Sequence, residues 1–261
     1  MTLDQKRMLE ILRELKKEYG IIAIKSEFEA EGSRTDEMIM LNEVVFRADL
    51  KLFIKVGGCE AIRDIDQCRL LGASGIMAPM IESPFAMEKF IGAVKKVYAA
   101  GELADMEMII NAETKICYEN LDAILEKGKG FLDTVIVGRV DFSASCGMTR
   151  DDINSDIIYG YTRDICERSR KAGFKPGFGG GISPDAIDFL LKMADCAEKY
   201  ETRKVVFPAC KDPARIRAGL LLAMEFEMLY LKSKCDFYAR MADEDFSRME
   251  MLKARLEKIK G

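Results

Sequence analysis

The sequence contains no histidine, and this absence limits the chemistry that the protein can perform. Every general acid or base must be a carboxylate, lysine, tyrosine, cysteine, a substrate group or metal-bound water. A Ser-His-Asp triad and a Cys-His nucleophile are therefore excluded. The eight cysteines form no CxxC pair, so the sequence shows neither zinc-finger spacing nor a disulfide framework.

Long apolar runs are also missing, and no basic amphipathic segment suggests a membrane surface. The first residues are not followed by the apolar stretch of a signal peptide. With a net charge of −4 and basic residues spread along the chain, no electrostatic footprint for nucleic acid is visible. We therefore expect a cytoplasmic protein that acts on small molecules, without nucleic-acid or membrane partners.

Short apolar runs alternate with amphipathic helical stretches, a pattern typical of a largely parallel α/β protein. The expected strands lie near residues 21–27, 50–56, 74–79, 106–112, 133–138, 175–179 and 203–207. The expected helices lie near 3–18, 33–48, 58–71, 84–99, 115–127, 150–172, 183–198 and 212–232. At 261 residues, the fold class predicted is a single-domain TIM-type (β/α) barrel, covering 1–261, with extra C-terminal helices.

Two details of this barrel stay open at the level of sequence. Seven strands are one short of a closed ring, so either one strand is missed or the N-terminal helix plugs the gap. Residues 212–261 form a helical extension longer than one barrel helix requires, which we expect at a homo-oligomer interface, although a plain surface helix pair is the alternative. Arg203 and Lys204 precede the last expected strand and are placed at its amino end, far from the barrel mouth.

Two carboxylates carry the functional argument. Glu113 and Asp141 follow two consecutive expected strands and are 28 residues apart, about the length of one βα unit. Equivalent ends of adjacent parallel strands face one mouth, where barrel active sites are built. Two oxygen ligands with free positions suit Mg²⁺ or Mn²⁺, and other divalent ions are possible. The alternative is that both acids merely cap the next helix.

Three segments at expected strand ends resemble the motifs of one family. They are residues 78–83 (Ala-Pro-Met-Ile-Glu-Ser), 111–114 (Asn-Ala-Glu-Thr) and 137–143 (Val-Gly-Arg-Val-Asp-Phe-Ser). Over roughly residues 20–210 the chain resembles the HpcH/HpaI aldolase and citrate lyase β-subunit family. The resemblance implies a barrel that binds a divalent metal through Glu113 and Asp141, with pyruvate or its enolate on the metal.

The same resemblance implies further roles near the metal. Backbone N–H groups around Gly138, Arg139 and Val140 would hold the keto-acid carboxylate. The family usually places an arginine on the second strand, where this chain has Lys55, a point charge that orients an enolate less strictly. Glu82 matches an acid of the citrate-lyase branch that could hydrogen-bond the metal shell.

The proton route departs from the aldolase branch, which uses a histidine at the end of the first strand. This chain has Phe28 at that place, while the preceding Glu27 matches the family's glutamate. Candidate bases are Glu27, Glu29 and a metal-bound hydroxide, although acids at a loop entrance are often merely solvated. Cys146 lies close after the metal aspartate and is interpreted as a packing residue because no histidine can activate it.

A glycine-rich stretch, Gly179, Gly180 and Gly181, follows a strand and opens a helix. Its backbone N–H groups could hold an anion such as the phosphate of phosphoenolpyruvate, or the glycines could simply form a tight turn. The predicted function is a metal-dependent carbon–carbon lyase or class II aldolase acting through a pyruvate enolate. The acceptor (aldehyde, sugar or acyl thioester) is not decided. The alternatives are a phosphoenolpyruvate-dependent enzyme making a 3-deoxy-2-ulosonic acid, and a non-catalytic keto-acid-binding protein.

Overall fold

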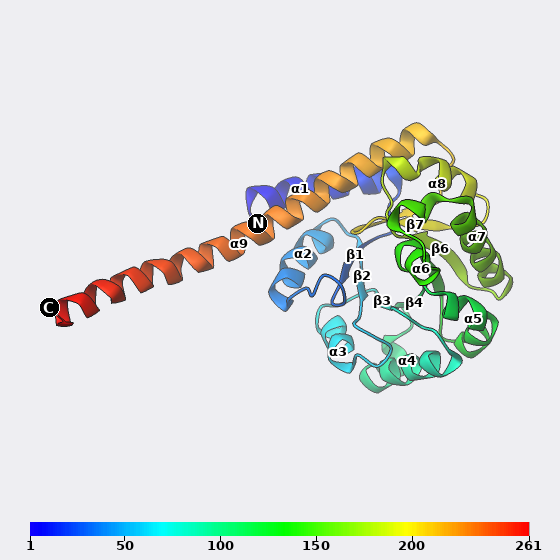
Figure 1. The fold of residues 1–261 in the computed structure, drawn as a ribbon, viewed down its shortest axis with the longest axis horizontal. Coiled ribbons are helices and arrows are strands. Elements are labelled where there is room, and N and C mark those ends of the chain that lie inside the picture. Colours follow the sequence, from blue (N-terminus) through cyan, green and yellow to red (C-terminus); the bar gives the residue numbers. More distant parts are fainter. Residues whose placement is uncertain (261) are drawn as a thin grey trace.

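Eight strands close into a barrel in sequence order in the computed structural model, which describes residues 1–260 (Figure 1). The strands are β1 (Ala23–Glu27), β2 (Lys51–Lys55), β3 (Gly75–Ala78), β4 (Glu107–Ala112), β5 (Thr134–Gly138), β6 (Lys175–Gly179), β7 (Lys199–Glu201) and β8 (Val205–Pro208). The predicted TIM-type barrel is confirmed. The missing eighth strand is β7, so the N-terminal helix does not plug a gap in the ring.

The last two strands differ from a regular barrel. Strands β1 to β7 run parallel, whereas β8 is antiparallel to both β7 and β1. A tight turn joins β7 to β8, in which the hydroxyl of Thr202 accepts a hydrogen bond from the backbone N–H of Val205 at 3.0 Å. The β7–β8 turn therefore lies at the carboxyl ends of the parallel strands, which is the mouth of the barrel.

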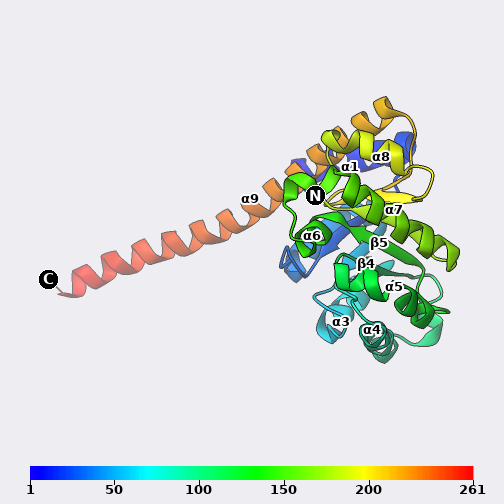
Figure 2. The ribbon, with the colours of Figure 1, turned by 45° about the vertical axis from the view of Figure 1, so that its right-hand side comes forward.

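The helices surround the barrel, with α9 extending far beyond it (Figures 1 and 2). They are α1 (Leu3–Glu14), α2 (Thr35–Arg47), α3 (Ile62–Leu70), α4 (Pro84–Val97), α5 (Lys115–Gly128), α6 (Arg139–Ser145), α7 (Asp156–Lys171), α8 (Ile187–Met193) and α9 (Pro213–Lys260). A π-helical turn at Leu15–Tyr19 follows α1, and 3-10 turns lie at Ala100–Glu102, Arg150–Asn154 and Pro184–Ala186. None of the helices described within residues 1–260 is long and apolar enough to cross a membrane.

The helix predictions need four corrections. The extra C-terminal helices, of which one was expected to end near residue 232, are a single continuous helix, α9, because no proline interrupts residues 214–260. The helix expected at 183–198 stops at Met193, because the chain then turns to form β7. The helix expected from residue 150 begins at Asp156, where Ser155 caps it by accepting from the N–H of Ile158. An unpredicted short helix, α6, starts directly after β5.

The barrel interior changes from apolar to charged along the strands. One side chain each from six strands forms a buried apolar layer inside the barrel: Ala23, Phe53, Met77, Ile109, Ile136 and Val206. Because side chains alternate along a strand, residues two positions further on share the same inward face. These positions place Lys25, Lys55 and Asn111 nearer the mouth. The two-residue period of the strands therefore places the polar residues of the site directly above the buried apolar layer.

Candidate functional site

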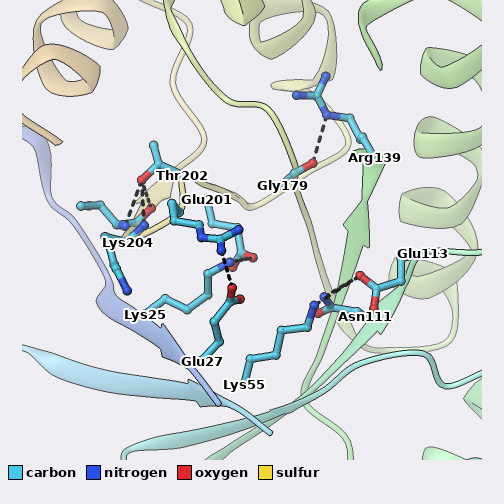
Figure 3. A network of polar contacts seen from close by, with 12 residues as sticks. Lys25, Glu27, Lys55, Asn111, Glu113, Arg139, Gly179, Glu201, Thr202 and Lys204 are labelled. Atoms are coloured by element: carbon cyan, nitrogen blue, oxygen red, sulfur yellow. Dashed lines mark hydrogen bonds and ion pairs between the residues drawn. The ribbon is translucent and has the colours of Figure 1, made fainter. Parts of the chain in front are cut away.

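A cavity of about 340 Å³ opens at the mouth of the barrel. It is lined by strand ends, by the loops that follow them and by one face of α9. Nine of the residues that line it were predicted as site residues from the sequence: Glu27, Lys55, Glu113, Gly138, Val140, Asp141, Gly179, Gly180 and Gly181. The structure thus brings together residues from β1, β2, β4, β5 and β6, several of which are seen in Figure 3.

Glu113 is the most enclosed carboxylate of the cavity. It follows β4 and is 1% exposed. Its Oε1 accepts a hydrogen bond from the backbone N–H of Met80 at 3.0 Å, and its Oε2 accepts one from Asn111 Nδ2 at 2.9 Å (Figure 3). Met80 adopts a left-handed backbone with φ of 50°, so the loop after β3 is held in an unusual conformation at this contact.

Gly138, at the end of β5, lets the backbone pass against this carboxylate. A Cβ at Gly138 would lie 2.5 Å from Glu113 Oε2, closer than any real contact. Asp141 follows three residues later in the first turn of α6, rather than at a strand end as expected, and is solvent-exposed. The glycine therefore permits the close approach that sets one buried and one exposed carboxylate at the same mouth.

The ionisation of Glu113 is shifted by its surroundings. Burial raises the pKa of Glu113, and the charge of Asp141 adds to this, while Lys55 and the hydrogen bonds of Asn111 and Met80 oppose it. A raised pKa means that the negative charge on Glu113 is incompletely compensated by its surroundings. A cation at this end of the cavity would relieve that deficit.

This donor set fits a hard divalent cation. Magnesium commonly takes one or two carboxylates and keeps water or substrate oxygens in its remaining positions. Within residues 1–260 no group of three or more His, Cys, Asp or Glu side chains gathers to form a closed metal cage. If a divalent ion binds in this cavity, Glu113 and Asp141 are the residues that would hold it.

Lys55 supplies a positive charge beside the carboxylates. Its Nζ lies 2.7 Å from Glu29 Oε2 and 3.6 Å from Glu113 Oε2. Burial alone would lower the pKa of Lys55, but Glu113 and Glu29 outweigh it and raise the pKa above its ordinary value. Lys55 is therefore an ammonium ion held inside the cavity, as its proposed role requires. Glu29 is bound to that lysine, although it is not part of the cavity lining.

Arg139 is not part of the cavity lining, and its side chain binds the loop after β6 instead. Its buried guanidinium donates to the backbone carbonyls of Gly179 at 3.1 Å and Gly180 at 2.7 Å, and it stacks 4.2 Å from the centre of the Phe189 ring. Burial lowers the pKa of Arg139 to about 10. The side chain thus fixes the loop after β6, while the backbone N–H groups of residues 139–141 begin α6 and lack intrahelical partners.

The glycine-rich loop lines the cavity, and packing also requires two of its glycines. Gly180 and Gly181 have positive φ values of 83° and 65°. A Cβ at Gly180 would lie 2.8 Å from the backbone nitrogen of Val140, and one at Gly181 would lie 2.2 Å from Ile153 Cδ1. The tight-turn interpretation is thereby supported by geometry, whereas phosphate binding by this loop stays a prediction.

The placement of Arg203 and Lys204 far from the mouth is wrong. Because β8 runs antiparallel, its amino end lies at the mouth, and Arg203 lines the cavity. Its guanidinium lies 2.9 Å from Glu27 Oε1 and donates from Nε to Glu31 Oε1 at 3.0 Å. Lys204, 1% exposed, pairs with Glu31 as well.

Two other candidate residues lie outside the cavity lining. Glu82 sits half-buried in the loop after β3, where its backbone carbonyl accepts a hydrogen bond from Asn120 Nδ2 at 3.0 Å. Its role near a metal stays a prediction. Cys146 is half-buried and packs against the apolar core, in agreement with its interpretation as a packing residue.

Several cavity residues were missed by sequence reasoning. They are Lys25, Asn111, Arg150, Glu201, Thr202, Ala223, Met224 and Glu227. Lys25 and Glu201 form a buried ion pair of 2.6 Å between β1 and β7 (Figure 3). Strand alternation could have identified Lys25, two residues before Glu27. No local signal marks the α9 residues, because only the tertiary fold brings that helix to the mouth.

Comparisons with known proteins agree with this architecture. A family model described as HpcH/HpaI aldolase/citrate lyase matches residues 33–176, more than half of the chain. No curated protein matches the sequence.

Solved structures share the fold at low sequence identity. An HpcH/HpaI aldolase from Desulfitobacterium hafniense DCB-2 is 15% identical with a TM-score of 0.60, covering 74% of this chain and 82% of that one. An HpcH/HpaI aldolase/citrate lyase family protein from Burkholderia cenocepacia J2315 is 15% identical with a TM-score of 0.60, covering 77% of this chain and 84% of that one. The citrate synthase SbnG is 17% identical with a TM-score of 0.56, covering 88% of this chain and 90% of that one. On the extent of the family match, the chain belongs to the HpcH/HpaI aldolase/citrate lyase family of lyases and aldolases.

Proposed function

We propose that the protein is a divalent-metal-dependent carbon–carbon lyase or aldolase that acts through a pyruvate enolate on a 2-keto-acid adduct. The observation that carries this proposal is the buried Glu113 carboxylate, set beside Asp141 and Lys55 at the mouth of a barrel from a lyase and aldolase family. Mg²⁺ or Mn²⁺ bound by Glu113 and Asp141 would act as a Lewis acid that stabilises developing enolate charge.

The chain's own residues would orient the keto acid. Its carboxylate would be bound by the backbone N–H groups of Gly138, Arg139 and Val140, where the start of α6 favours negative charge. Gly180 leaves space in front of these nitrogens, since a Cβ there would occupy it. Lys55, 6% exposed and held by Glu29, would neutralise the oxygen on which enolate charge develops.

The experiment is solvent deuterium exchange into the methyl group of pyruvate, followed by NMR with Mg²⁺ or Mn²⁺ present and absent. Wild type is compared with Asp141→Ala and with Asp243→Ala, a control acid that is exposed on α9. Exchange that needs the metal, is lost in Asp141→Ala and survives in Asp243→Ala supports the proposal. Mn²⁺ binding measured by electron paramagnetic resonance separates loss of the metal from loss of the chemistry.

Two other functions have specific outcomes in the same experiment. The glycines that line the cavity favour a phosphoenolpyruvate-dependent condensing enzyme as the second candidate. It would bind phosphoenolpyruvate with no exchange into pyruvate and would release inorganic phosphate on condensation. A keto-acid-binding protein without catalysis, which Phe28 in place of the family histidine permits, would bind pyruvate with the metal and show neither exchange nor phosphate release.

A further inference from the structure

The wall of the cavity opposite the strand ends comes from α9. Ala223, Met224 and Glu227 line the cavity, at the i, i+1 and i+4 spacing of one helix face. The charged groups that act on Glu227 are Lys204, Glu31, Arg203 and Lys25, which belong to β1, the loop after it and the β7–β8 hairpin. Glu113 and Asp141 lie at the ends of β4 and β5 instead. Glu227 therefore faces the part of the cavity beyond the metal carboxylates.

The other acids on the Glu227 side of the cavity already have cationic partners. Lys25 pairs with Glu201 at 2.6 Å, and Arg203 pairs with Glu27 at 2.9 Å. Glu31 is bound by both Arg203 and Lys204. In these pairs the three cations Lys25, Arg203 and Lys204 neutralise the three carboxylates of Glu201, Glu27 and Glu31.

Glu227 is different, because its half-buried carboxylate makes no hydrogen bond or ion pair within the part of the chain that the structure describes. The remaining candidate bases are less available: Glu29 lies 2.7 Å from Lys55 Nζ, and Glu27 is 4% exposed beneath Arg203. In a chain without histidine, Glu227 is the cavity carboxylate on this side with oxygens free for a substrate proton.

We infer that Glu227 is the catalytic acid–base group on the acceptor side of the cavity. This inference rests on the proposed function, in which the keto acid occupies the Glu113 and Asp141 end. In the cleavage direction, the Glu227 carboxylate takes the proton from the adduct's hydroxyl group. The C–O bond becomes a carbonyl, the carbon–carbon bond breaks, and its electron pair passes to the pyruvate enolate. The enolate carbon then gains a proton from water, and Glu227 returns its proton to solvent.

In the addition direction, protonated Glu227 donates to the carbonyl oxygen of the acceptor as the new carbon–carbon bond forms. Burial raises the pKa of Glu227, and nearby Lys204 opposes that effect only in part. A raised pKa brings a carboxyl group closer to the range in which it both accepts and donates protons near neutral pH. The acceptor is thus a carbonyl compound whose oxygen reaches α9.

The test separates the two halves of the reaction. Pyruvate methyl exchange requires no acceptor, whereas addition of pyruvate to an aldehyde requires the acceptor-side acid. Wild type, Glu227→Gln, Glu227→Asp and the control Glu225→Gln are assayed for exchange and for addition to glycolaldehyde, glyoxylate and acetaldehyde. Glu225 lies two residues before Glu227 on α9 but pairs with Arg7 at 2.8 Å and is not part of the cavity lining.

We expect Glu227→Gln to lose about 100-fold or more in addition rate, in keeping with general acid catalysis, while exchange stays within about twofold. In wild type, the addition rate should fall as rising pH deprotonates Glu227. This fall should disappear in Glu227→Gln and move to a different pH in Glu227→Asp. Equal addition by wild type and Glu227→Gln, parallel loss of exchange and addition, or a wild type that exchanges but adds to none of the three aldehydes would each overturn the inference. Absence of exchange in wild type would instead mark failure of the proposed function.

Discussion

The guanidinium of Arg203 lies 2.9 Å from the carboxylate of Glu27 and thereby joins the β7–β8 turn to the end of β1. Glu27 is 4% exposed, whereas nearly half of the Arg203 side chain faces solvent. A regular βα unit is absent between β7 and β8, and this ion pair ties the hairpin to the rim of the cavity. The same ion pair gives the buried Glu27 carboxylate a cationic partner.

Replacing Arg203 should destabilise the protein. Arg203→Ala would leave the buried Glu27 carboxylate without its cation, and we expect a loss of about 1–3 kcal/mol in the free energy of unfolding. Arg203→Lys should retain part of this stability because it keeps the charge. Urea unfolding measures both variants. Lys211→Ala removes an exposed pair with Asp195 and should leave the midpoint unchanged, and equal midpoints for Arg203→Ala and this control would contradict the prediction.

The hairpin also shows where sequence reasoning reached its limit. Strands β1 to β5 and β8 could be predicted because apolar runs mark them, but β7 has only three residues, two of them charged. Lys199 and Glu201 point inward and are stabilised by Glu107 and Lys25, partners that are distant in sequence. No hydrophobic run could reveal such a strand. The error in placing Arg203 followed from it, since an unseen β7 makes β8 appear parallel.

The candidate site was predicted to a different extent at its two ends. The spacing of Glu113 and Asp141, about one βα unit, was enough to place both at one mouth, although Asp141 lies in the first turn of α6 rather than at the strand end. Glu227 could not be found, since α9 approaches the mouth only through tertiary packing and no motif surrounds that residue. Local spacing thus predicts the groups carried by consecutive strands, whereas groups supplied by a distant helix require the structure.

Gly138 offers a direct test of the Glu113 arrangement. In Gly138→Ala the new methyl group would overlap Glu113, whose Oε2 and Cβ lie 2.5 and 2.9 Å from the ideal Cβ position. The carboxylate must move, so we expect Mn²⁺ affinity and pyruvate exchange to fall at least about tenfold, the equivalent of about 1.4 kcal/mol. Isothermal titration calorimetry and NMR measure the two effects.

The matched control is Gly160→Ala on α7, where a Cβ meets nothing within 4 Å. Because alanine is more favourable than glycine inside a helix, this variant should gain about 0.5–1 kcal/mol in the free energy of unfolding and keep the metal affinity of wild type. Unchanged Mn²⁺ affinity in Gly138→Ala would show that Glu113 need not sit against the backbone.

The ion pair between the half-buried Glu107 and the buried Lys199 at the floor of the barrel predicts a pH dependence of stability. Burial opposes ionisation of Glu107, but Lys199 and the Thr134 hydroxyl outweigh burial and lower the pKa of Glu107 below its ordinary value of 4.5. A depressed pKa gives stability that is present above pH 4.5 and is lost as pH falls through the folded-state pKa. We expect Glu107→Gln, which leaves Lys199 buried and unpaired, to cost about 3–5 kcal/mol near neutral pH.

The difference in unfolding free energy between wild type and Glu107→Gln should shrink as pH falls below 4.5. Urea titrations at several pH values measure it. In the control, Glu107→Gln with Lys199→Met, no buried ammonium remains, and most of the lost stability should return. A difference that stays constant through the acid range would contradict the depressed pKa.

The second half of α9 should pack against another copy of the chain. It leaves the barrel as a single helix without neighbours (Figures 1 and 2). Met249, Leu252, Leu256 and Ile259 follow the 3–4 spacing of a coiled-coil seam, and Leu256 and Ile259 are 54% and 81% exposed. A projecting helix with this apolar stripe is marginally stable alone in water and would be stabilised by burial between subunits.

The double variant Leu252→Glu with Leu256→Glu should therefore lower the molar mass measured by light scattering, whereas the control Ser247→Glu, on another face of the helix, should not. A monomeric wild type, or a mass unaffected by the paired glutamates, would remove α9 from the subunit interface and leave it as a surface helix.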